Sequence, residues 1–325
     1  MAGLQAALLS WYDAEARPLP WRGHDVSAWD ILLAEIILQQ TQMDTGLPYW
    51  HRIREAYPSP SELAADSEEN LLKLWQGCGY YARARNLYKL ACMINTQPLP
   101  STREGLLSLP GIGPYTASAV ASIAFGEKVA CVDGNVRRVI SRLRAEHLSD
   151  TELQSVADEL LYNQRPGDWN QAMMELGSLI CTAKKPKCES CPLSSNCLAT
   201  KTESPTEWPS RRKSVQKKVK ATAIIVQGKS GLLLKAREGR TLGGLWGLPY
   251  FEGEDSTTKL LESLQLTRAD VLEIGHIRHD FTHKQIEITV LMMEASDQYD
   301  LVNPDSVPLA TLDRKVIALC KGEQS

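Results

Sequence analysis

The segment that most restricts how this chain can fold carries four cysteines in the spacing C-x6-C-x2-C-x5-C, namely Cys181, Cys188, Cys191 and Cys197. Four thiolates can hold a tetrahedral zinc ion or a cubane iron–sulfur cluster. A structural zinc site usually shows two C-x2-C pairs, and this segment has only one. The remaining cysteines of the chain are scattered, unlike the dense disulfide framework of a small secreted domain. The segment therefore predicts a metal or cluster site.

Residues 1 to about 200 predict a helical region. Apolar residues recur there at three- and four-residue spacing, as in ELAADSEENLLKLW (62–75) and NVRRVISRLRAEHL (135–148). Short breaks that contain glycine or proline, such as AYPSPSE and NQRPGD, separate these stretches. We expect roughly ten helices of ordinary length. No repeat with a period of about 20 to 50 residues indicates a solenoid.

The character of the chain changes after this region. Residues 201–218 are polar, basic and proline-bearing, which is typical of an interdomain linker. Residues 219–325 carry strand signals, because KATAIIVQ and GLLLKARE stand on either side of a GKSG turn and QIEITVLMME partly alternates. TTKLLESLQL is typical of a helix. The sequence thus predicts an all-α region, a linker and a smaller α+β domain.

The overall charge does not predict a nucleic-acid partner. The formal net charge is −3 and the isoelectric point is about 6.1, so any DNA contact must come from local clusters such as KKPK (184–187) and RRKSVQKKVK (211–220). Alone, such runs are usually solvated surface. Because no apolar run reaches about 18 residues and the first residues lack signal-peptide features, we expect a cytoplasmic protein, nucleoid-associated if bacterial.

The cysteine segment, 181–197, resembles the cluster loop of the helix-hairpin-helix DNA glycosylases, the endonuclease III superfamily, in which the same spacing occurs. The resemblance implies that the four cysteines hold a 4Fe-4S cluster. It also implies that basic residues between the first two cysteines touch DNA phosphates, and Lys184 and Lys185 stand there. A zinc-bearing DNA-binding module is the alternative.

A second segment, LPGIGPYTASAVASIAFG (109–126), places Gly111 and Gly113 in a turn before a predicted helix. Backbone N–H groups at a helix N-terminus suit a phosphate, although most glycine-rich turns are only turns. The segment resembles the helix-hairpin-helix motif of the same superfamily, at about residues 106–126. Bifunctional members carry a lysine two residues after the second glycine, as the amine of a Schiff base. Tyr115 occupies that position here, which implies a monofunctional glycosylase.

Asp133, in VDGNVRRV, has two interpretations. Its place just before a predicted helix is typical of a helix N-cap. The resemblance implies instead the aspartate that acts on the sugar. Both can hold, because a capping carboxylate is still negatively charged. The resemblance also implies that Tyr115 and Asn135 support the site by orienting the acid and the sugar.

Four further segments narrow the resemblance: LPWR (19–22), AEIILQQTQ (34–42), GYYARARNL (79–87) and NQAMMELGSLIC (170–181). Together they are similar to the MutY-type adenine DNA glycosylase family. That similarity implies that Gln40 and Tyr80 wedge into the duplex near the lesion. For Tyr80 the alternative is an ordinary packed aromatic side chain.

The C-terminal domain extends this resemblance. TLGGLWGLPYFEG (241–253) is similar to the opening of a Nudix fold, but the helix TTKLLESLQL lacks the R-E-x-x-E-E set of a working Nudix hydrolase. We therefore expect a Nudix-like domain that recognises rather than hydrolyses. In the MutY-type family this domain reads 8-oxoguanine through a Phe-Ser-His or Phe-Thr-His loop, which Phe281, Thr282 and His283 match.

Glu35 interrupts the apolar run ILLAEIIL (31–38). Burial disfavours the charged form of a carboxyl group, so such a glutamate can stay protonated near neutral pH and donate a proton. The alternative, common for a glutamate in a helix, is a side chain turned outward. The resemblance implies that Glu35 is the acid that protonates adenine and that Asp133 stabilises the charge left on the sugar.

These features lead to one hypothesis: a monomeric, monofunctional enzyme of base excision repair acting on double-stranded DNA. It removes a flipped adenine paired with 8-oxoguanine and, more weakly, with guanine. Two alternatives stay open. One is a glycosylase of the same superfamily for another mismatch, such as thymine opposite guanine. The other is a protein that binds the lesion without cutting.

Overall fold

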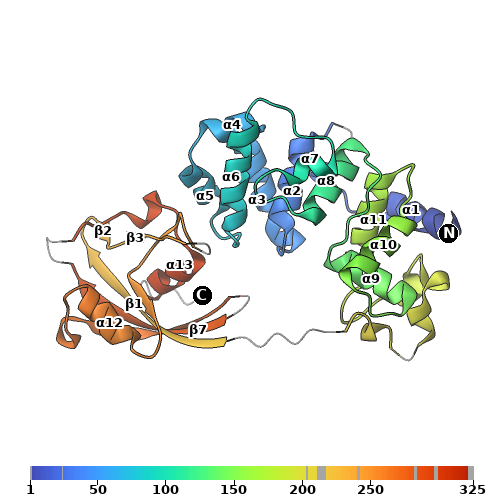
Figure 1. The fold of residues 1–325 in the computed structure, drawn as a ribbon. Coiled ribbons are helices and arrows are strands. Elements are labelled where there is room, and N and C mark those ends of the chain that lie inside the picture. Colours follow the sequence, from blue (N-terminus) through green and yellow to red (C-terminus); the bar gives the residue numbers. More distant parts are fainter. Residues whose placement is uncertain are drawn as a thin grey trace. The chain divides into compact units, whose positions relative to one another are not determined.

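In the computed structural model of the protein, the described residues are 2–23, 25–202, 204–210, 217–239, 242–281, 284–295 and 299–320. They divide between two compact units. The first unit comprises residues 1–50, 57–61 and 89–212, and the second comprises residues 51–56, 62–88 and 213–325. Figure 1 labels the α-helices of both units and the strands β1, β2, β3 and β7.

The first unit is helical. Its helices are α1 (Ala2–Glu15), η1 (Pro20–Arg22), α2 (Ala28–Leu38), the start of α3 (Met43–Ala56), α7 (Arg103–Leu107), α8 (Pro114–Phe125), α9 (Gly134–Arg144), α10 (Asp150–Leu160), α11 (Pro166–Leu179) and the short η2 (Cys188–Ser190), η3 (Ser194–Asn196), η4 (Leu198–Lys201) and η5 (Pro205–Glu207). Local sequence sets several starts, because Ser27 and Asp30 form a reciprocal capping box at α2. Pro114 and Pro166 begin α8 and α11, where a missing N–H costs nothing.

One hydrophobic core joins α1, α9, α10 and α11, which Figure 1 shows side by side. Leu8, Ile140, Leu153 and Trp169 are almost completely buried in it. Leu193 also reaches this core from between the third and fourth predicted cysteine ligands, and its exposure is only 1%. The cysteine segment is therefore packed onto the same core as the helices around it.

The second unit combines helices and a sheet. Three helices, α4 (Pro60–Ala65), α5 (Glu68–Trp75) and α6 (Ala82–Ile94), lie wholly or mainly in it. The remaining elements are β1 (Lys217–Gly228), β2 (Gly231–Leu232), β3 (Lys235–Ala236), β4 (Trp246–Gly247), β5 (Tyr250–Glu252), α12 (Ser256–Ser263), η6 (Arg268–Asp270), β6 (Leu272–Asp280), β7 (Lys284–Glu294), η7 (Pro304–Ser306) and α13 (Thr311–Cys320).

Within the described residues the main sheet has the strand order β2-β1-β7-β6, and β5 also pairs with β1. The central pair β1 and β7 is parallel, whereas β6 and β7 are antiparallel. Residues 221–226 of β1 are buried on both faces, because one face packs on a core that includes α13 and the other on a core with α12 (Figure 1). This burial explains the continuous apolar run in β1.

The predicted fold class, a helical region followed by a smaller domain of strands and helices, is confirmed. The segment GLLLKARE was expected to be one strand, and here the structure differs. It forms two short strands, β2 and β3, because Leu232 is the last residue of β2 paired with β1 while Lys235 pairs with Gly247 of β4. Among the described residues, none of the helices combines the length and the apolar character that crossing a bilayer demands.

Gly167, in the first turn of α11, allows that helix to touch the backbone of α8. A Cβ at this position would stand 2.7 Å from the carbonyl oxygen of Ser122 and 2.8 Å from the Cα of Ile123. We predict that Gly167→Ala destabilises the protein by about 1–3 kcal/mol, because overpacking forces the two helices apart. Thermal or urea unfolding measures the change.

Gly3 provides the matched control. It also lies in a helix, α1, and a Cβ there would meet no atom within 4 Å. Gly3→Ala should leave stability unchanged or raise it by up to about 1 kcal/mol, because alanine is the better helix former. Equal effects of the two substitutions would contradict the close approach of α8 and α11.

Candidate active site

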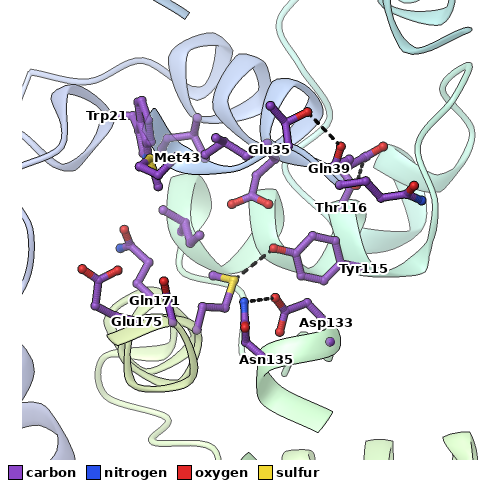
Figure 2. A pocket seen from close by; sticks show the side chains of 18 of the residues that line it. Trp21, Glu35, Gln39, Met43, Tyr115, Thr116, Asp133, Asn135, Gln171 and Glu175 are labelled. Carbon is purple, nitrogen blue, oxygen red and sulfur yellow. Dashed lines mark hydrogen bonds between the residues drawn. The ribbon is translucent and has the colours of Figure 1, made fainter. Parts of the chain in front are cut away.

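The described part of the first unit contains a cavity of about 1030 Å³ between α2, α8, the start of α9 and α11 (Figure 2). Seven of the residues singled out from the sequence line it: Glu35, Gln40, Gly111, Gly113, Tyr115, Asp133 and Asn135. These residues come from three separate stretches of the chain. The fold therefore brings together the two carboxyl groups that were expected to act as a pair.

Glu35 is carried into the cavity by α2. Seven of its neighbours in the helix are buried aliphatic or aromatic side chains, and the indole N–H groups of Trp29 and Trp50 anchor the helix by donating to the carbonyl oxygens of Tyr57 and Asp30. The half-buried Glu35 carboxyl faces the cavity rather than bulk solvent (Figure 2). Burial raises the pKa of Glu35 to about 7.

Other groups modulate that pKa in both directions. A hydrogen bond with Tyr115 lowers the pKa of Glu35, the nearby Asp133 raises it, and Arg22 lowers it. Burial, helped by the negative charge of Glu35, keeps the pKa of Tyr115 well above its ordinary value, so that this hydroxyl stays protonated. The Tyr115 hydroxyl also donates to Sδ of Met174 at 3.0 Å (Figure 2).

Asp133 caps α9, as one of its two interpretations predicted. One carboxylate oxygen accepts from the backbone N–H of Val136 at 2.7 Å. The other accepts from Nδ2 of Asn135 at 2.9 Å (Figure 2). Burial raises the pKa of Asp133, and these two donors together with Arg138 oppose the rise. The cap leaves the carboxylate at the cavity wall, so both interpretations are compatible with its position.

The stretch before Asp133 is held by a buried amide. Asn170 of α11 is only 2% exposed. Its Nδ2 donates to Oγ of Ser122 at 2.8 Å and to the carbonyl of Val129 at 2.9 Å, while its Oδ1 accepts from the backbone N–H of Cys131 at 3.2 Å. These three bonds fix the segment 129–131 between α8 and α11 and thereby fix where Asp133 begins α9.

A chain of hydrogen bonds leads from Asp133 to the cysteine segment. Asn135, which donates to Asp133, accepts from Nη2 of Arg138 at 2.8 Å. Arg138 also donates through Nε to the carbonyl of Cys181 at 2.7 Å and through Nη2 to the carbonyl of Gly177 at 2.7 Å. The first cysteine and the carboxylate of the cavity are thus linked through two side chains.

Arg142, which is 2% exposed, holds the cysteine segment to α9. Its guanidinium donates to four backbone carbonyl oxygens, those of Cys181, Thr182, Ala183 and Trp208. It also lies 3.3 Å from Sγ of Cys181, and its own carbonyl accepts from Sγ of Cys197 at 3.3 Å. The positive charge of Arg142 opposes the rise in the pKa of Cys188 that burial causes.

The four cysteine side chains suit a cluster. Burial and the charges of the three neighbouring cysteine sulfurs raise the pKa of Cys191 to about 11. The four sulfur atoms are therefore near enough to one another to interact electrostatically. Among the described residues, no three His, Cys, Asp or Glu side chains are grouped as ligands of a single metal ion. Soft thiolates are the ligands that iron–sulfur clusters take, and Cys181, Cys188, Cys191 and Cys197 would hold one by their Sγ atoms.

The remaining predicted residues are placed as follows. Gln40 and Tyr80 both adopt positive φ, 55° and 49°, and both are exposed. Tyr80 belongs to the second unit, where Arg83 stacks 5.1 Å from its ring centre. Lys184 and Lys185 are exposed on the cysteine segment. Phe281 has its ring 4.7 Å from that of His279, while Thr282 and His283 lie outside the described residues.

The sequence analysis missed a group of polar residues on the far wall of the cavity. Glu175, 1% exposed, accepts from Arg17 at 2.7 Å and from Arg22 at 3.1 Å. Gln171 and Met174 precede it on the same face of α11. Their spacing of three and four residues within NQAMMELGSLIC was the available signal, because such residues share one helix face.

Comparison with protein families gives three matches. Residues 33–160 match the HhH-GPD superfamily of base excision DNA repair proteins, residues 181–197 the iron-sulfur binding domain of endonuclease III, and residues 221–319 the NUDIX domain. Among solved structures, a thermostable thymine-DNA glycosylase has 30% identity and a TM-score of 0.56 over 60% of this chain and 93% of its own. A structure of endonuclease III trapped as a covalent intermediate with DNA has 27% identity and a TM-score of 0.52, over 60% of this chain and 92% of its own. The chain is a helix-hairpin-helix DNA glycosylase that carries a 4Fe-4S cluster.

Relatives that match most of this chain specify the kind of glycosylase. The human adenine DNA glycosylase is 31% identical over 100% of this chain and 75% of its own length. The Arabidopsis thaliana and Buchnera aphidicola enzymes of that name are 33% and 28% identical over 89% and 97% of this chain. The chain spans 57% of the Arabidopsis protein and 97% of the Buchnera protein. This chain belongs to the adenine DNA glycosylase family.

The buried pair of Glu175 with Arg17 and Arg22 generates a stability prediction. Burial alone would raise the pKa of Glu175, but the hydrogen bonds from the two arginines outweigh it and lower the pKa to about 2 from an ordinary value of 4.5. Because the folded-state pKa is depressed, the pair contributes stability above pH 4.5 and loses it as the pH falls toward 2. Glu175→Gln should cost about 3 kcal/mol at pH 7.

Anaerobic urea unfolding between pH 7 and pH 3 measures this effect. The wild type should lose stability through the acidic part of that range, and Glu175→Gln should lose less. Glu159→Gln is the control, because its ion pair with Arg144 is about half exposed and should contribute no more than about 1 kcal/mol. Parallel pH curves for the wild type and Glu175→Gln would contradict the assignment.

Proposed function

We propose that this chain is a monofunctional glycosylase that removes adenine paired with 8-oxoguanine, and more weakly adenine paired with guanine. One observation carries the proposal: Glu35 and Asp133 line the same cavity but have different surroundings. Glu35 lies among aliphatic side chains and has its pKa raised to about 7. Asp133 instead accepts hydrogen bonds from a backbone N–H and from Asn135. Two carboxyl groups in unlike environments suit two different tasks.

Glu35 acts first, as the acid. Its carboxyl O–H breaks as a proton passes to N7 of the flipped adenine, and the glycosidic bond then breaks with its electron pair going to the base. A group whose pKa lies near the working pH is well matched to this transfer. Water adds to the sugar afterwards, and the Glu35 carboxylate accepts the proton that the water gives up.

Asp133 stabilises the oxocarbenium charge that the departing adenine leaves on the sugar. Its position is supported by the cap of α9 and by Asn135, so the carboxylate is held before the charge develops. Tyr115, which orients Glu35, stands where bifunctional relatives have a lysine. With a tyrosine at that position, this site offers no amine for a Schiff base, so the sugar–phosphate backbone stays intact.

DNA contacts are assigned to exposed groups of both units. Gly111 has φ of 77° and Gly113 precedes α8, so their turn presents backbone N–H groups to a phosphate. Lys184 and Lys185 add positive charge on the cysteine segment. Gln40 and Tyr80 fill the space that the flipped base leaves. Their left-handed backbone conformations are costly for residues other than glycine, and such strain is concentrated at functional positions.

Lesion recognition is assigned to residues 219–325, joined to the catalytic region of residues 1–200 by a linker at 201–218, in a monomer. Phe281, stacked on its edge against His279, begins the segment Phe281-Thr282-His283 that reads 8-oxoguanine. Lys284 lies 5.5 Å from the centre of the Phe281 ring. A domain that adds lesion contacts without hydrolysis is consistent with the absence of the R-E-x-x-E-E set from the sequence.

A single-turnover assay tests the function. Duplexes carry one central A opposite 8-oxoguanine or guanine, or a T opposite guanine, and strand breaks are scored with and without alkali. We predict fast release of adenine opposite 8-oxoguanine, slower release opposite guanine, and breaks only after alkali. Glu35→Gln should be slower by a factor of about 10²–10⁴ or more, because it holds no transferable acidic proton.

Glu159→Gln, an exposed substitution of the same type, should behave like the wild type. Preferred release of thymine opposite guanine would replace the proposal with the activity named for the thymine-DNA glycosylase of similar fold. Tight lesion binding without any base release by brown, cluster-bearing protein would show a recognition protein instead.

The pH dependence gives a second test. Glu35 must be protonated to act, and its pKa is raised to about 7. The single-turnover rate should therefore be highest below pH 7 and fall about tenfold per pH unit above it. A rate that rises steadily from pH 6 to pH 9 would rule out Glu35 as the proton donor.

A further inference from the structure

Two acceptors, Sδ of Met174 and the Glu35 carboxyl, compete for the single hydroxyl hydrogen of Tyr115. The Tyr115 hydroxyl lies 3.0 Å from Sδ of Met174 (Figure 2). The Glu35 carboxyl lines the same cavity, and hydrogen bonding to this hydroxyl lowers the pKa of Glu35. A phenol carries a single O–H hydrogen, whereas a thioether sulfur can only accept one. At any moment, therefore, Tyr115 can donate either to Met174 or to Glu35.

The protonation state of Glu35 decides which acceptor is better. A carboxylate is the stronger acceptor, because hydrogen bonds to charged groups are roughly twice as strong as neutral ones. A protonated Glu35 instead offers a hydrogen of its own, and the Tyr115 oxygen can remain an acceptor only if its hydrogen points elsewhere. Met174 supplies that alternative, since its half-buried side chain on α11 lines the same cavity.

We propose that Met174 is a positioning residue that holds the hydroxyl hydrogen of Tyr115 while Glu35 is protonated and releases it once Glu35 has given up its proton. The proposal deepens the proposed function and rests on its assignment of Glu35 as the acid. The hydroxyl turns without any movement of heavy atoms. Tyr115 donates little to Glu35 while Glu35 is protonated, and it donates a full hydrogen bond once Glu35 is a carboxylate. This difference favours the transition state over the ground state.

Several other ionisable groups face Glu35 and must be counted in any pH experiment. They come from every element around it and are Tyr115 of α8, Cys131 and Asp133 before α9, and Arg22 of η1. Glu175 of α11 is engaged by Arg17 and Arg22. A substitution at Met174 removes none of these charges, so it isolates the effect of the sulfur.

Met174→Leu tests the proposal with little change in volume. Leucine cannot accept a hydrogen bond, so Tyr115 should donate to Glu35 at all times and stabilise the carboxylate. The pKa of Glu35 should then fall by about one unit. The midpoint of the rate against pH should move down by the same amount, and the rate above that midpoint should fall about tenfold.

Met173→Leu is the matched control. Met173 precedes Met174, is 2% exposed and packs in the helical core away from the cavity lining. It should leave the midpoint where the wild type has it. Tyr115→Phe should move the midpoint upward, because Glu35 loses its donor. In the Tyr115→Phe background Met174→Leu should then have no further effect, since the sulfur acts only through the hydroxyl.

An infrared titration of the DNA-free holoenzyme provides a readout that does not depend on glycosylase activity. The carboxyl C=O band of Glu35 is identified by its loss in Glu35→Gln, and its midpoint is followed in Met174→Leu, in Met173→Leu and in the Tyr115 variants. A downward shift in Met174→Leu that disappears without the Tyr115 hydroxyl supports the proposal. An unchanged midpoint overturns it and makes Met174 a simple wall of the cavity.

The two levels of inference fail separately. If Glu35→Gln keeps full adenine release, the proposed function fails whatever the infrared band does. If adenine release depends on Glu35 but the band does not respond to Met174→Leu, only the role of Met174 fails. Thermal unfolding of each variant, with the visible absorbance of the cluster, excludes loss of folding as the cause.

Discussion

Helix α9 begins with backbone N–H groups that have no partner within the helix, and Asp133 satisfies one of them. The carboxylate that caps the helix is also the one that faces the cavity. Its second oxygen holds Asn135, Asn135 holds Arg138, and Arg138 reaches the carbonyl of Cys181. The capping interaction of Asp133 therefore sets the start of α9 and the position of the Asp133 carboxylate in the cavity. Through Asn135 and Arg138 it also helps to place Cys181, the first residue of the cysteine segment.

Two glutamates of the cavity, on different helices, show how burial and neighbouring charge together set a pKa. Glu35 is kept close to neutrality because α2 surrounds it with apolar side chains, whereas Glu175 is kept ionised by Arg17 and Arg22 although it is more deeply buried. Burial acts in the same direction on both glutamates, and the presence or absence of cations decides the outcome. The cavity thus holds two glutamates with widely separated pKa values, about 7 for Glu35 and about 2 for Glu175.

The sequence predicted the parts of this structure that depend on local pattern or on exact spacing. The helical period, the cap at Asp133 and the four cysteines are of that kind. The apolar run alone did not say which way Glu35 points, and the resemblance to a known family was needed to choose. The pairing of Glu175 with Arg17 was not predicted, because its partners are 158 residues apart and meet only through tertiary packing. The positive φ angles of Gln40 and Tyr80 could not be predicted from the sequence either, since neither residue type prefers that backbone conformation.

Leu193 connects the cysteine segment to the helical core, where it is buried with side chains from α1, α9, α10 and α11. Arg142 ties the start of the same segment to α9 through backbone carbonyls, which need no iron to accept a hydrogen bond. The segment therefore has its place from ordinary packing and polar contacts. The segment is thus attached to the helical region by contacts that use none of its four sulfur atoms, so these attachments and ligation of a cluster do not compete for the same groups.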